Sequence, residues 1–417
     1  MRFLPTAELA SSASAVDISA SVGATALILL SVQLPATFLL LSRLLKGARR
    51  QQPLQAKQPT PLQSPVVSVV VPTLNEAHRI EPCLAGLSAQ PDVVREILVV
   101  DSRSTDGTQA KVAAFGKKDS RIRLITDDAL PDGWVGRPWA LHSGFLSTDA
   151  NSDWVLGVDA DTQPQPGLAA TLLHEAETQG YDIVSLSPRF ILKSAGEWWL
   201  QPAMLMTLIY RFDSAGVVVA DTERAIANGQ CFLSRRKVLK ELNGYTCAAS
   251  SFCDDVTLVR EAARRGYKVG FLDGADVISV RMYEGIAETW SGWGRSLDLK
   301  DSISQGQLWS DLWLLVSTQA LPIPLLLLAW IGVKLGAWES VGSVMFVAAV
   351  MLNVLLLTIR MGMQVAVAGS YDWTQSNPFK AMFFWFAPFA DPVAVLRIIL
   401  SAFQRSIKWR GKTYRRI

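Results

Sequence analysis

The chain has 417 residues, of which 50% are hydrophobic and 18% are charged, and its formal net charge is +3. It is therefore richer in apolar residues than an average soluble protein, and its charge alone does not predict a surface for nucleic acid or another polyanion. The four cysteines match no zinc-site spacing, so we expect them to be reduced and either buried or neutral.

The apolar excess is concentrated in three uncharged stretches, at residues 18–42, 312–333 and 340–359. Each is long enough for a helix that crosses a hydrocarbon core of about 30 Å. A fourth apolar stretch, 381–403, is interrupted by two prolines, an aspartate and an arginine. These interruptions favour a re-entrant or interfacial element over a plain span.

Positive charges indicate the orientation. Four basic residues directly follow the first stretch, namely Arg43, Lys46, Arg49 and Arg50. The first stretch is longer than the apolar core of a typical cleaved signal peptide, which is the alternative, so we expect an uncleaved anchor. The positive-inside tendency predicts that its N-terminus is outside and that the following domain is in the cytoplasm. The C-terminal tail carries six further Arg and Lys residues after position 404, and we expect it to lie on an anionic inner leaflet.

A Pro/Gln-rich stretch at 51–65 predicts an extended linker. After it, apolar runs with the composition of buried strands lie at 66–72, 96–101, 123–126 and 154–159. Helical segments are predicted between them, at 79–89 and 138–145. Strands that alternate with helices predict an α/β domain whose mostly parallel sheet is covered on both sides.

Polar or acidic residues follow three of these strands: Asn75 and Glu76, then Asp101, then Asp159 and Asp161. The carboxyl ends of parallel strands are where ligands bind in such sheets. Two carboxylates there could hold a divalent cation, Mg²⁺ or Mn²⁺, that neutralises a diphosphate. Glu76 and Asp101 would then be available for the base and ribose. Because Asp is also common in turns, a plain turn is the alternative.

Four segments in this order and spacing resemble the family 2 glycosyltransferases. They are 70–76 (VVPTLNE), 99–107 (VVDSRSTDG), 158–161 (VDAD) and 253–255 (CDD), and the resemblance covers roughly 66–295. It implies the GT-A nucleotide-diphospho-sugar transferase fold, with a mixed, mostly parallel sheet. It also implies a nucleotide-diphosphate sugar as donor and a cation held by Asp159 and Asp161.

A second acidic pair, Asp254 and Asp255, precedes a helical pattern. Inverting glycosyl transfer needs a carboxylate that takes the proton from the acceptor hydroxyl. In the family's acidic pair the second carboxylate is this base, so the resemblance implies Asp255 as base with Asp254 in support. The alternative is that both acids only cap the helix.

Residues 133–140 (GWVGRPWA) are similar to the Gly-Trp-x-Gly-Lys-x-Trp-Ala segment of a subgroup that glycosylates carotenoids and hopanoid-like lipids. Arg137 stands where Lys is usual, and it keeps the positive charge with a forked geometry. We therefore expect Arg137 to contact the donor phosphates. Trp139 is a further donor-side candidate, with a core aromatic as the alternative.

The acceptor side is indicated by 228–236, which is similar to the family's acceptor-lining segment and includes Asn228 and Gly229. Asn228 could equally be a turn residue. Downstream, Trp290, Trp293 and Leu297 share one helical face, as in an interfacial helix beside which an acceptor enters. Arg295 is a candidate for the diphosphate, although the Gln-x-x-Arg-Trp motif of polymer-making synthases is absent.

The sequence thus predicts an anchor at 1–50, a linker at 51–65, a cytoplasmic GT-A domain at 66–280, amphipathic interfacial helices at 281–311 and a membrane region at 312–417. The expected activity is inverting transfer of one sugar to a hydroxyl of a lipophilic acceptor. Resemblance favours a myxol-type carotenoid and a bacterial inner or internal photosynthetic membrane. Another membrane lipid (hopanoid, ceramide or diacylglycerol), a processive polysaccharide synthase and a sugar-nucleotide sensor are the alternatives.

Overall fold

Seven strands form the main sheet, in the order β3-β2-β1-β4-β8-β6-β9. The computed structural model describes residues 6–404 except 58–65, 91–92, 219–220, 295–296, 298, 300 and 335–343, and also 406–409 and 412–415. The strands of this sheet are β1 Val67–Thr73, β2 Val94–Asp101, β3 Ile122–Thr126, β4 Trp154–Val158, β6 Ile183–Ser187, β8 Cys231–Arg235 and β9 Val269–Asp273. Only the two pairings of β8 are antiparallel, so the predicted mixed, mostly parallel sheet is confirmed.

Helices cover both faces of this sheet. On one face, Val67, Val69 and Val71 of β1 share a buried core with α2 Ile80–Ser88, α3 Thr108–Gly116 and α5 Leu168–Gln179. On the other face, Val70 packs with α4 Gly136–Ser147, α7 Arg236–Glu241 and α8 Asp254–Arg264. Because successive side chains of a strand point to opposite faces, a central strand that is apolar throughout needs this double cover.

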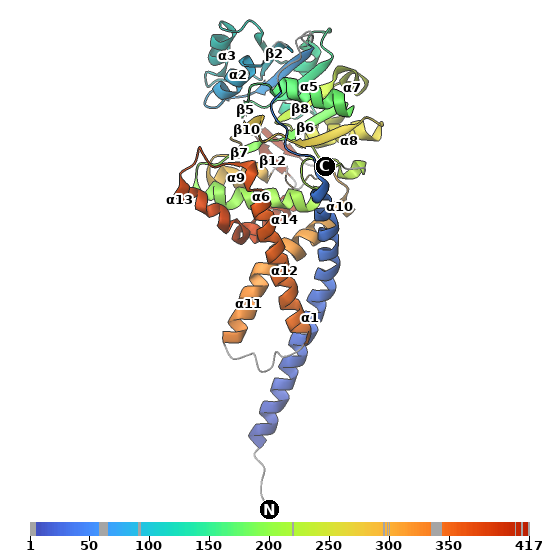
Figure 1. The fold of residues 1–417 in the computed structure, drawn as a ribbon, viewed down its shortest axis with the longest axis vertical. Helices are drawn as coiled ribbons and strands as arrows, with labels where there is room; N and C mark the ends of the chain where they lie inside the picture. The colour runs from blue at the N-terminus through green and yellow to red at the C-terminus, as the bar shows by residue number, and fades with distance from the viewer. Residues whose placement is uncertain are drawn as a thin grey trace, which may run out of the picture.

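A second, smaller sheet lies beside the first, in the order β11-β7-β10-β5. Its strands are β5 Thr162–Pro164, β7 Arg189–Ile191, β10 Ile278–Val280 and β11 Tyr371–Asp372. β5 begins directly after the Asp159–Asp161 segment, whereas β11 follows the long helix α12 Val344–Ala366 near the C-terminal end of the chain. The small sheet therefore links the acidic segment to the membrane-side helices (Figure 1).

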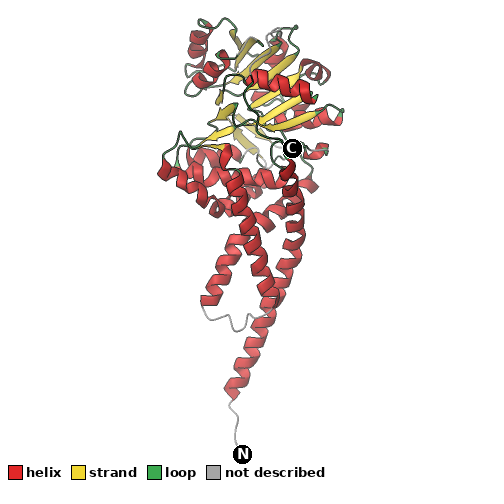
Figure 2. Ribbon diagram, in the orientation of Figure 1, coloured by secondary structure: helices red, strands yellow, loops and turns green. Residues whose placement is uncertain are grey.

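Long helices extend away from the sheets (Figures 1 and 2). Among the described residues, three helical segments are long and apolar enough to cross a membrane: Val22–Arg49, which includes most of α1 Thr6–Leu44, then α12, and Pro378–Phe403. A fourth candidate is bent by 42° between Gln305–Ala320, which begins with α10 Gln305–Leu315, and α11 Pro322–Lys334. The predicted spans at 18–42 and 340–359 thus correspond to helices over their described residues, and the predicted span at 312–333 contains the bend.

The fourth apolar stretch contains three helical pieces: α13 Pro378–Ala381, a 3₁₀ helix Met382–Ala390, and α14 Asp391–Phe403. Its re-entrant or interfacial character stays a prediction, since its length and hydropathy also suit a span. Arg360, the residue that follows the third predicted span (340–359), lies inside α12. There it is 2% exposed and pairs with Asp391 at 2.6 Å.

A layer of helices separates the sheets from the long helices (Figure 1). It includes α6 Ala195–Phe212, which the sequence analysis did not predict, and α9 Gly285–Trp293. α6 starts with a capping box, in which Ser194 accepts a hydrogen bond from the Glu197 N–H. Trp293 and Leu297 are only 6% and 4% exposed and pack in the apolar cluster that α6 forms with the long helices. These two side chains are therefore covered by protein, and the interfacial position of this segment stays a prediction.

The start of the predicted linker is also packed on the domain. Leu54 is 7% exposed and its N–H donates to the Asp273 carbonyl at 2.8 Å. The Lys57 N–H donates to Thr171 Oγ1 at 2.8 Å. Residues 51–57 thus run along the domain surface instead of forming a free linker, and 58–65 lie outside the described residues.

The cysteines and the basic tail complete the description. Cys83, Cys231 and Cys253 are buried and Cys247 is exposed, all as free thiols. Burial of three cysteines agrees with the expectation of buried or neutral cysteines, and partial burial raises the pKa of the Cys247 thiol to about 11. The tail forms a hairpin of β12 Ser406–Trp409 and β13 Lys412–Arg415.

Candidate active site

A cavity of about 820 Å³ lies at the carboxyl ends of the main-sheet strands. β1 lies between β2 and β4, so the strand order runs outward from β1 in one direction to β2 and β3 and in the other direction to β4. In open α/β sheets, ligands bind at the carboxyl ends of the strands where the strand order reverses in this way. The cavity lining includes the predicted acids Asp159, Asp161, Asp254 and Asp255. The structure thus brings together two acidic pairs that are about a hundred residues apart in the sequence.

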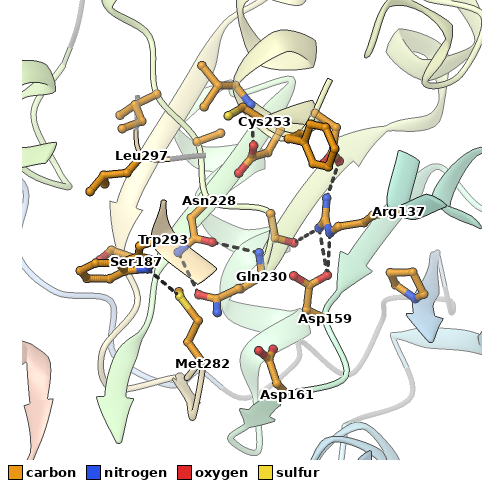
Figure 3. A pocket seen from close by; sticks show the side chains of 18 of the residues that line it. Arg137, Asp159, Asp161, Ser187, Asn228, Gln230, Cys253, Met282, Trp293 and Leu297 are labelled. Carbon is orange, nitrogen blue, oxygen red and sulfur yellow. Dashed lines mark hydrogen bonds and ion pairs between the residues drawn. The ribbon is translucent and has the colours of Figure 1, made fainter. Parts of the chain in front are cut away.

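Arg137 is the centre of the polar network in this cavity (Figure 3). Its Nε donates to Asp159 Oδ1 at 3.0 Å, and its Nη2 donates to the Gly229 carbonyl at 2.7 Å. Its Nη1 donates to Asp254 Oδ2. Burial alone would lower the pKa of Arg137, but Asp159, Asp254 and Asp255 raise it well above its ordinary value. The guanidinium is therefore a permanent positive charge that joins the two acidic pairs.

Asp159 and Asp161 follow β4, and the turn between them is fixed by its own hydrogen bonds. The Thr162 hydroxyl donates to the Asp159 carbonyl at 2.8 Å. In contrast to Asp159, Asp161 lies apart from the Arg137 network (Figure 3), and its Oδ1 is buried with no hydrogen-bond partner among the described residues. Burial, together with the charge of Asp159, raises the pKa of Asp161 to about 8.

Asp254 and Asp255 occupy the first turn of α8, where a helix N-terminus stabilises negative charge. Asp254 is 3% exposed and is paired with Arg137. Asp255 Oδ1 accepts a hydrogen bond from the Val256 N–H at 2.9 Å. Burial and the neighbouring Asp254 raise the pKa of Asp255 to about 7, against the opposing effect of Arg137. The two acids are thus in different environments, and Asp255 is the one suited to exchange a proton near neutral pH.

The predicted acceptor residues Asn228 and Gly229 also line the cavity. Asn228 is held in place, because its N–H donates to Ser185 Oγ at 2.7 Å and its Oδ1 accepts from the Gln230 N–H at 3.0 Å. A Cβ on Gly229 would lie 2.8 Å from Arg137 Cζ. The absence of a side chain at Gly229 thus leaves room for the Arg137 guanidinium.

The predicted donor residues of β1 and β2 divide into two groups. Glu76 is 6% exposed, lines the cavity and pairs with Arg79 at 2.8 Å. Asn75 and Asp101 are not among the lining residues. Asp101 instead accepts hydrogen bonds from the Ser104 N–H at 3.0 Å and from Gln109 Nε2 at 2.6 Å, which shape its own loop.

Asn75, at a φ of 57°, joins the same loops, since its Oδ1 accepts from the Thr105 N–H at 2.9 Å. A residue that the sequence analysis missed, Asp127, lines the cavity directly after β3. It accepts a hydrogen bond from Ser102 Oγ at 2.7 Å, and burial raises its pKa. The rule that identified Asp101 and Asp159, an acid at the end of a parallel strand, would have found it.

Trp139 lines the cavity, and its Nε1 donates to the Asp128 carbonyl at 3.1 Å. It packs edge-on against Trp134, with ring centroids 5.1 Å apart, and lies over His142. Trp139 thus lies both in the cavity wall and in an aromatic cluster, and its contact with the donor stays a prediction.

Apolar residues line the end of the cavity that faces the layer of helices with α6 and α9. They include Leu205, Leu208 and Ile209 of α6, Val367 after α12, and Trp293 and Leu297. The sequence indicated Trp293 as a residue on the acceptor side, but it gave no indication that residues of α6 line the cavity. Trp290 is not among the lining residues, because its ring lies under the Arg397 guanidinium at 5.3 Å. Arg295 lies outside the described residues.

The residues present fit a divalent cation in part. Among the described residues, no group of three His, Cys, Asp or Glu side chains converges as a complete metal site. Asp159 and Asp161 are nevertheless hard oxygen donors of the kind that Mg²⁺ and Mn²⁺ take, and Asp161 Oδ1 has no other partner. Such a site would be completed by oxygens of a diphosphate, as is common for Mg²⁺.

Residues 68–243 match the family model described as Glycosyl transferase family 2. The 4,4'-diaponeurosporenoate glycosyltransferase of Staphylococcus haemolyticus is 26% identical over 242 residues, which are 57% of this chain and 63% of that protein. The UDP-Glc:alpha-D-GlcNAc-diphosphoundecaprenol beta-1,3-glucosyltransferase WfgD of Escherichia coli is 33% identical over 94 residues, 22% of this chain and 36% of that protein. The chain thus spans less than two thirds of the length of these curated relatives.

Among solved structures, the chain is similar to the mannosyltransferase PcManGT from Pyrobaculum calidifontis in complex with GDP-Man and Mn²⁺, with a TM-score of 0.51. The two are 19% identical, and the likeness covers 91% of this chain and 98% of that one. At this identity the likeness shows the fold. Residues 68–243 thus match the model of this family, and the strand order and this likeness show that the domain has the GT-A fold.

Proposed function

We propose that the chain is an inverting glycosyltransferase that moves one sugar from a nucleotide-diphosphate sugar to a hydroxyl group of a lipophilic acceptor. One observation carries this proposal: a single cavity joins the four carboxylates to the apolar wall made by α6, Trp293 and Val367. A site with charged groups at one end and apolar side chains at the other suits a phosphate-bearing donor and a lipid acceptor that meet inside it.

The donor end is assigned to the acids that follow β1, β3 and β4. Asp159 and Asp161 would hold a Mg²⁺ or Mn²⁺ ion, which supplies positive charge to the diphosphate leaving group when bound. Glu76 and Asp127 line the neighbouring wall and are candidates for hydrogen bonds to ribose and base. Asp101 does not line the cavity, but it holds the loop after β2 in place by accepting a hydrogen bond from the Ser104 N–H.

Asp255 is the proposed base. Its pKa of about 7 lets it be ionised at neutral pH and still accept a proton readily. The acceptor oxygen forms the new bond to the anomeric carbon and gives its proton to Asp255. The bond from that carbon to the diphosphate oxygen breaks, and the diphosphate leaves with the electron pair. Attack from the face opposite the leaving group inverts the anomeric configuration.

The acceptor end faces the layer of helices beside the candidate membrane spans. Leu205, Leu208 and Ile209 lie on α6, which packs in one apolar cluster with α1 and α12. An acceptor dissolved in the bilayer could therefore reach the cavity without exposing its chain to water. We propose a cytoplasmic catalytic domain, consistent with Arg43, Lys46, Arg49 and Arg50 at the domain end of α1.

A carotenoid is the acceptor that we favour. The relative from Staphylococcus haemolyticus is named for transfer to diaponeurosporenoate, and the relative from Escherichia coli for transfer to a diphosphoundecaprenol-linked sugar. Both names describe acceptors with long isoprenoid chains. Hopanoids, ceramides and diacylglycerol are alternatives of similar chemistry. A processive polysaccharide synthase ranks lower, because the sequence lacks the Gln-x-x-Arg-Trp motif.

The test is a gene deletion followed by mass spectrometry of extracted pigments and glycolipids. We expect one lipid to lose a single hexose or deoxyhexose, and the wild-type gene to restore it. A gene with Asp255→Asn should not restore it, although the protein is made. Loss of a water-soluble polysaccharide with unchanged lipids would instead favour the processive synthase.

A further inference from the structure

Arg137 holds Asp159, the carboxylate to which the proposed function assigns the cation. Resting on that function, we infer that Arg137 is a counterion that changes partners: it holds Asp159 while the donor is absent and moves to the diphosphate when nucleotide and cation bind. Nucleotide and cation binding are then coupled by this residue as well as by the phosphate oxygens. We call Arg137 a gate in the sense that it competes with the cation for Asp159 until nucleotide binds.

The geometry of the guanidinium supports the first part of this inference. Asp159 Oδ1 accepts a hydrogen bond from Arg137 Nε at 3.0 Å and forms an ion pair with Nη2 at 2.9 Å. Nη1 bonds to Asp254, and Nη2 also reaches the Gly229 carbonyl. Arg137 therefore uses all three of its nitrogens on groups from three separate segments. This arrangement neutralises Asp159 in the absence of any donor.

The neighbouring Asp161 is the opposite case. Its Oδ1 is buried and has no partner among the described residues. One half of the Asp-x-Asp pair is thus free for a cation and the other half is occupied by a guanidinium. Two positive charges a few ångströms apart repel each other strongly in a partly buried site. A cation alone must therefore compete with Arg137 for Asp159.

A diphosphate removes this competition, because it brings negative oxygens that can accept the guanidinium fork and ligate the cation together. The movement needs only side-chain torsions, since Arg137 lies in the first turn of α4, whose start is fixed by the Val135 N–H bond to the Ala249 carbonyl at 2.7 Å. By thermodynamic linkage, the factor by which bound nucleotide increases the affinity for the cation equals the factor by which bound cation increases the affinity for the nucleotide.

Two variants test the gate in different ways. Arg137→Gln removes the charge. Gly229→Ala keeps the charge and displaces the guanidinium, because the added Cβ would lie 2.8 Å from Arg137 Cζ. Arg189→Gln is the matched control, since Arg189 pairs with Asp276 and does not line the cavity. Thermal melting checks that each variant is folded.

The measurement is Mn²⁺ binding to the full chain in detergent, by electron paramagnetic resonance, with and without GDP or UDP. We expect Arg137→Gln and Gly229→Ala to bind Mn²⁺ alone about tenfold or more tightly than the wild type, and Arg189→Gln to match the wild type. The enhancement of Mn²⁺ affinity by the nucleotide should be smaller in Arg137→Gln than in the wild type.

Two results would overturn the inference, and they are distinguishable. If the wild type binds Mn²⁺ with nucleotide, but neither folded variant binds Mn²⁺ alone more tightly, Arg137 is a fixed structural counterion and the proposed function stands. If the wild type binds no Mn²⁺ with either nucleotide, the proposed cation site fails together with the gate.

Discussion

The rate of glycosyl transfer should fall as the pH drops below 7. The pH at which the rate falls should depend on the charge of Asp254. Asp255 must be ionised to accept the proton of the acceptor, and its pKa is raised to about 7 from an ordinary value of 3.8. Ionisation of Asp255 is thus half complete at pH 7. Two units lower, at pH 5, roughly 1% of the enzyme would carry the ionised base, so kcat/KM should fall about fiftyfold below its value at pH 7, which is about a hundredfold below its plateau at high pH.

Asp254→Asn tests the cause of this shift. After burial, the charge of Asp254 contributes most to the raised pKa of Asp255, and Arg137 opposes it. Removing the Asp254 charge ends the repulsion and leaves the positive charge of Arg137 nearby. Both changes favour ionised Asp255, so its pKa should fall and the acid limb of the pH profile should move to lower pH.

The assay is kcat/KM for the donor from pH 5 to 9 at saturating acceptor, because this ratio reports groups of the free enzyme. The position of the acid limb is the readout, since the height of the profile also changes if Asp254 supports catalysis. Asp276→Asn removes an acid that does not line the cavity and should leave the limb in place. A wild-type profile that is flat down to pH 5, or an upward shift in Asp254→Asn, would refute the assignment of Asp255.

The remaining predictions concern the cation, the base, the acceptor wall and the packing of the sheet. Asp161→Asn should abolish Mn²⁺ binding in the presence of nucleotide, measured by electron paramagnetic resonance, and leave the melting temperature unchanged within a few degrees; retained Mn²⁺ binding would remove Asp161 from the site. Asp255→Asn should keep donor affinity, measured by calorimetry, and lose about 10²- to 10⁴-fold in turnover, as expected for a general base; parallel loss of donor affinity would place Asp255 in donor binding instead. Leu208→Trp, which fills the apolar end of the cavity, should raise KM for the lipid acceptor while donor hydrolysis in water continues at the wild-type rate; equal effects on both would mean that this wall does not receive the acceptor. Gly144→Ala should destabilise the domain by about 1–3 kcal/mol, because the new Cβ would lie 2.9 Å from Val100 Cγ2 in a packed core, and a melting temperature equal to that of the wild type would show that α4 can move away.

The main sheet could be predicted because its central strands are buried on both faces. Runs such as Val67–Thr73 therefore read as strands from composition alone, and each predicted boundary lies within two residues of the observed one. The strands of the small sheet are two or three residues long, too short to show any periodicity. Their pairing depends on contacts between segments far apart in the chain.

The acids of the site could be predicted, but their partners could not. A strand end places Asp159 at the sheet edge, whereas its contact with Arg137 spans 22 residues and that of Arg137 with Asp254 spans 117. These contacts exist because α4 and α8 cover the same face of the sheet. Trp290 and Trp293 lie on α9 as the helical periodicity predicts, whereas Leu297 lies beyond the end of this helix at Trp293. The periodicity indicated burial, and only the fold shows that protein covers this face.

The acceptor wall illustrates the same difficulty. α6 is apolar over most of its surface and contains Pro202, so no polar stripe indicates which side it presents to the cavity. Its role follows from its place between the sheets and the long helices (Figure 1).

The most direct test of glycosyl transfer to a membrane acceptor uses the purified chain in vesicles that contain candidate lipids. Labelled UDP- and GDP-sugars are added with Mn²⁺, and the organic extract is examined by mass spectrometry and by NMR of the anomeric proton. We predict a lipid that carries one sugar in inverted anomeric configuration, formed by the wild type and not by Asp255→Asn. A water-soluble polymer, a retained configuration, or equal product from Asp255→Asn would contradict the proposed reaction.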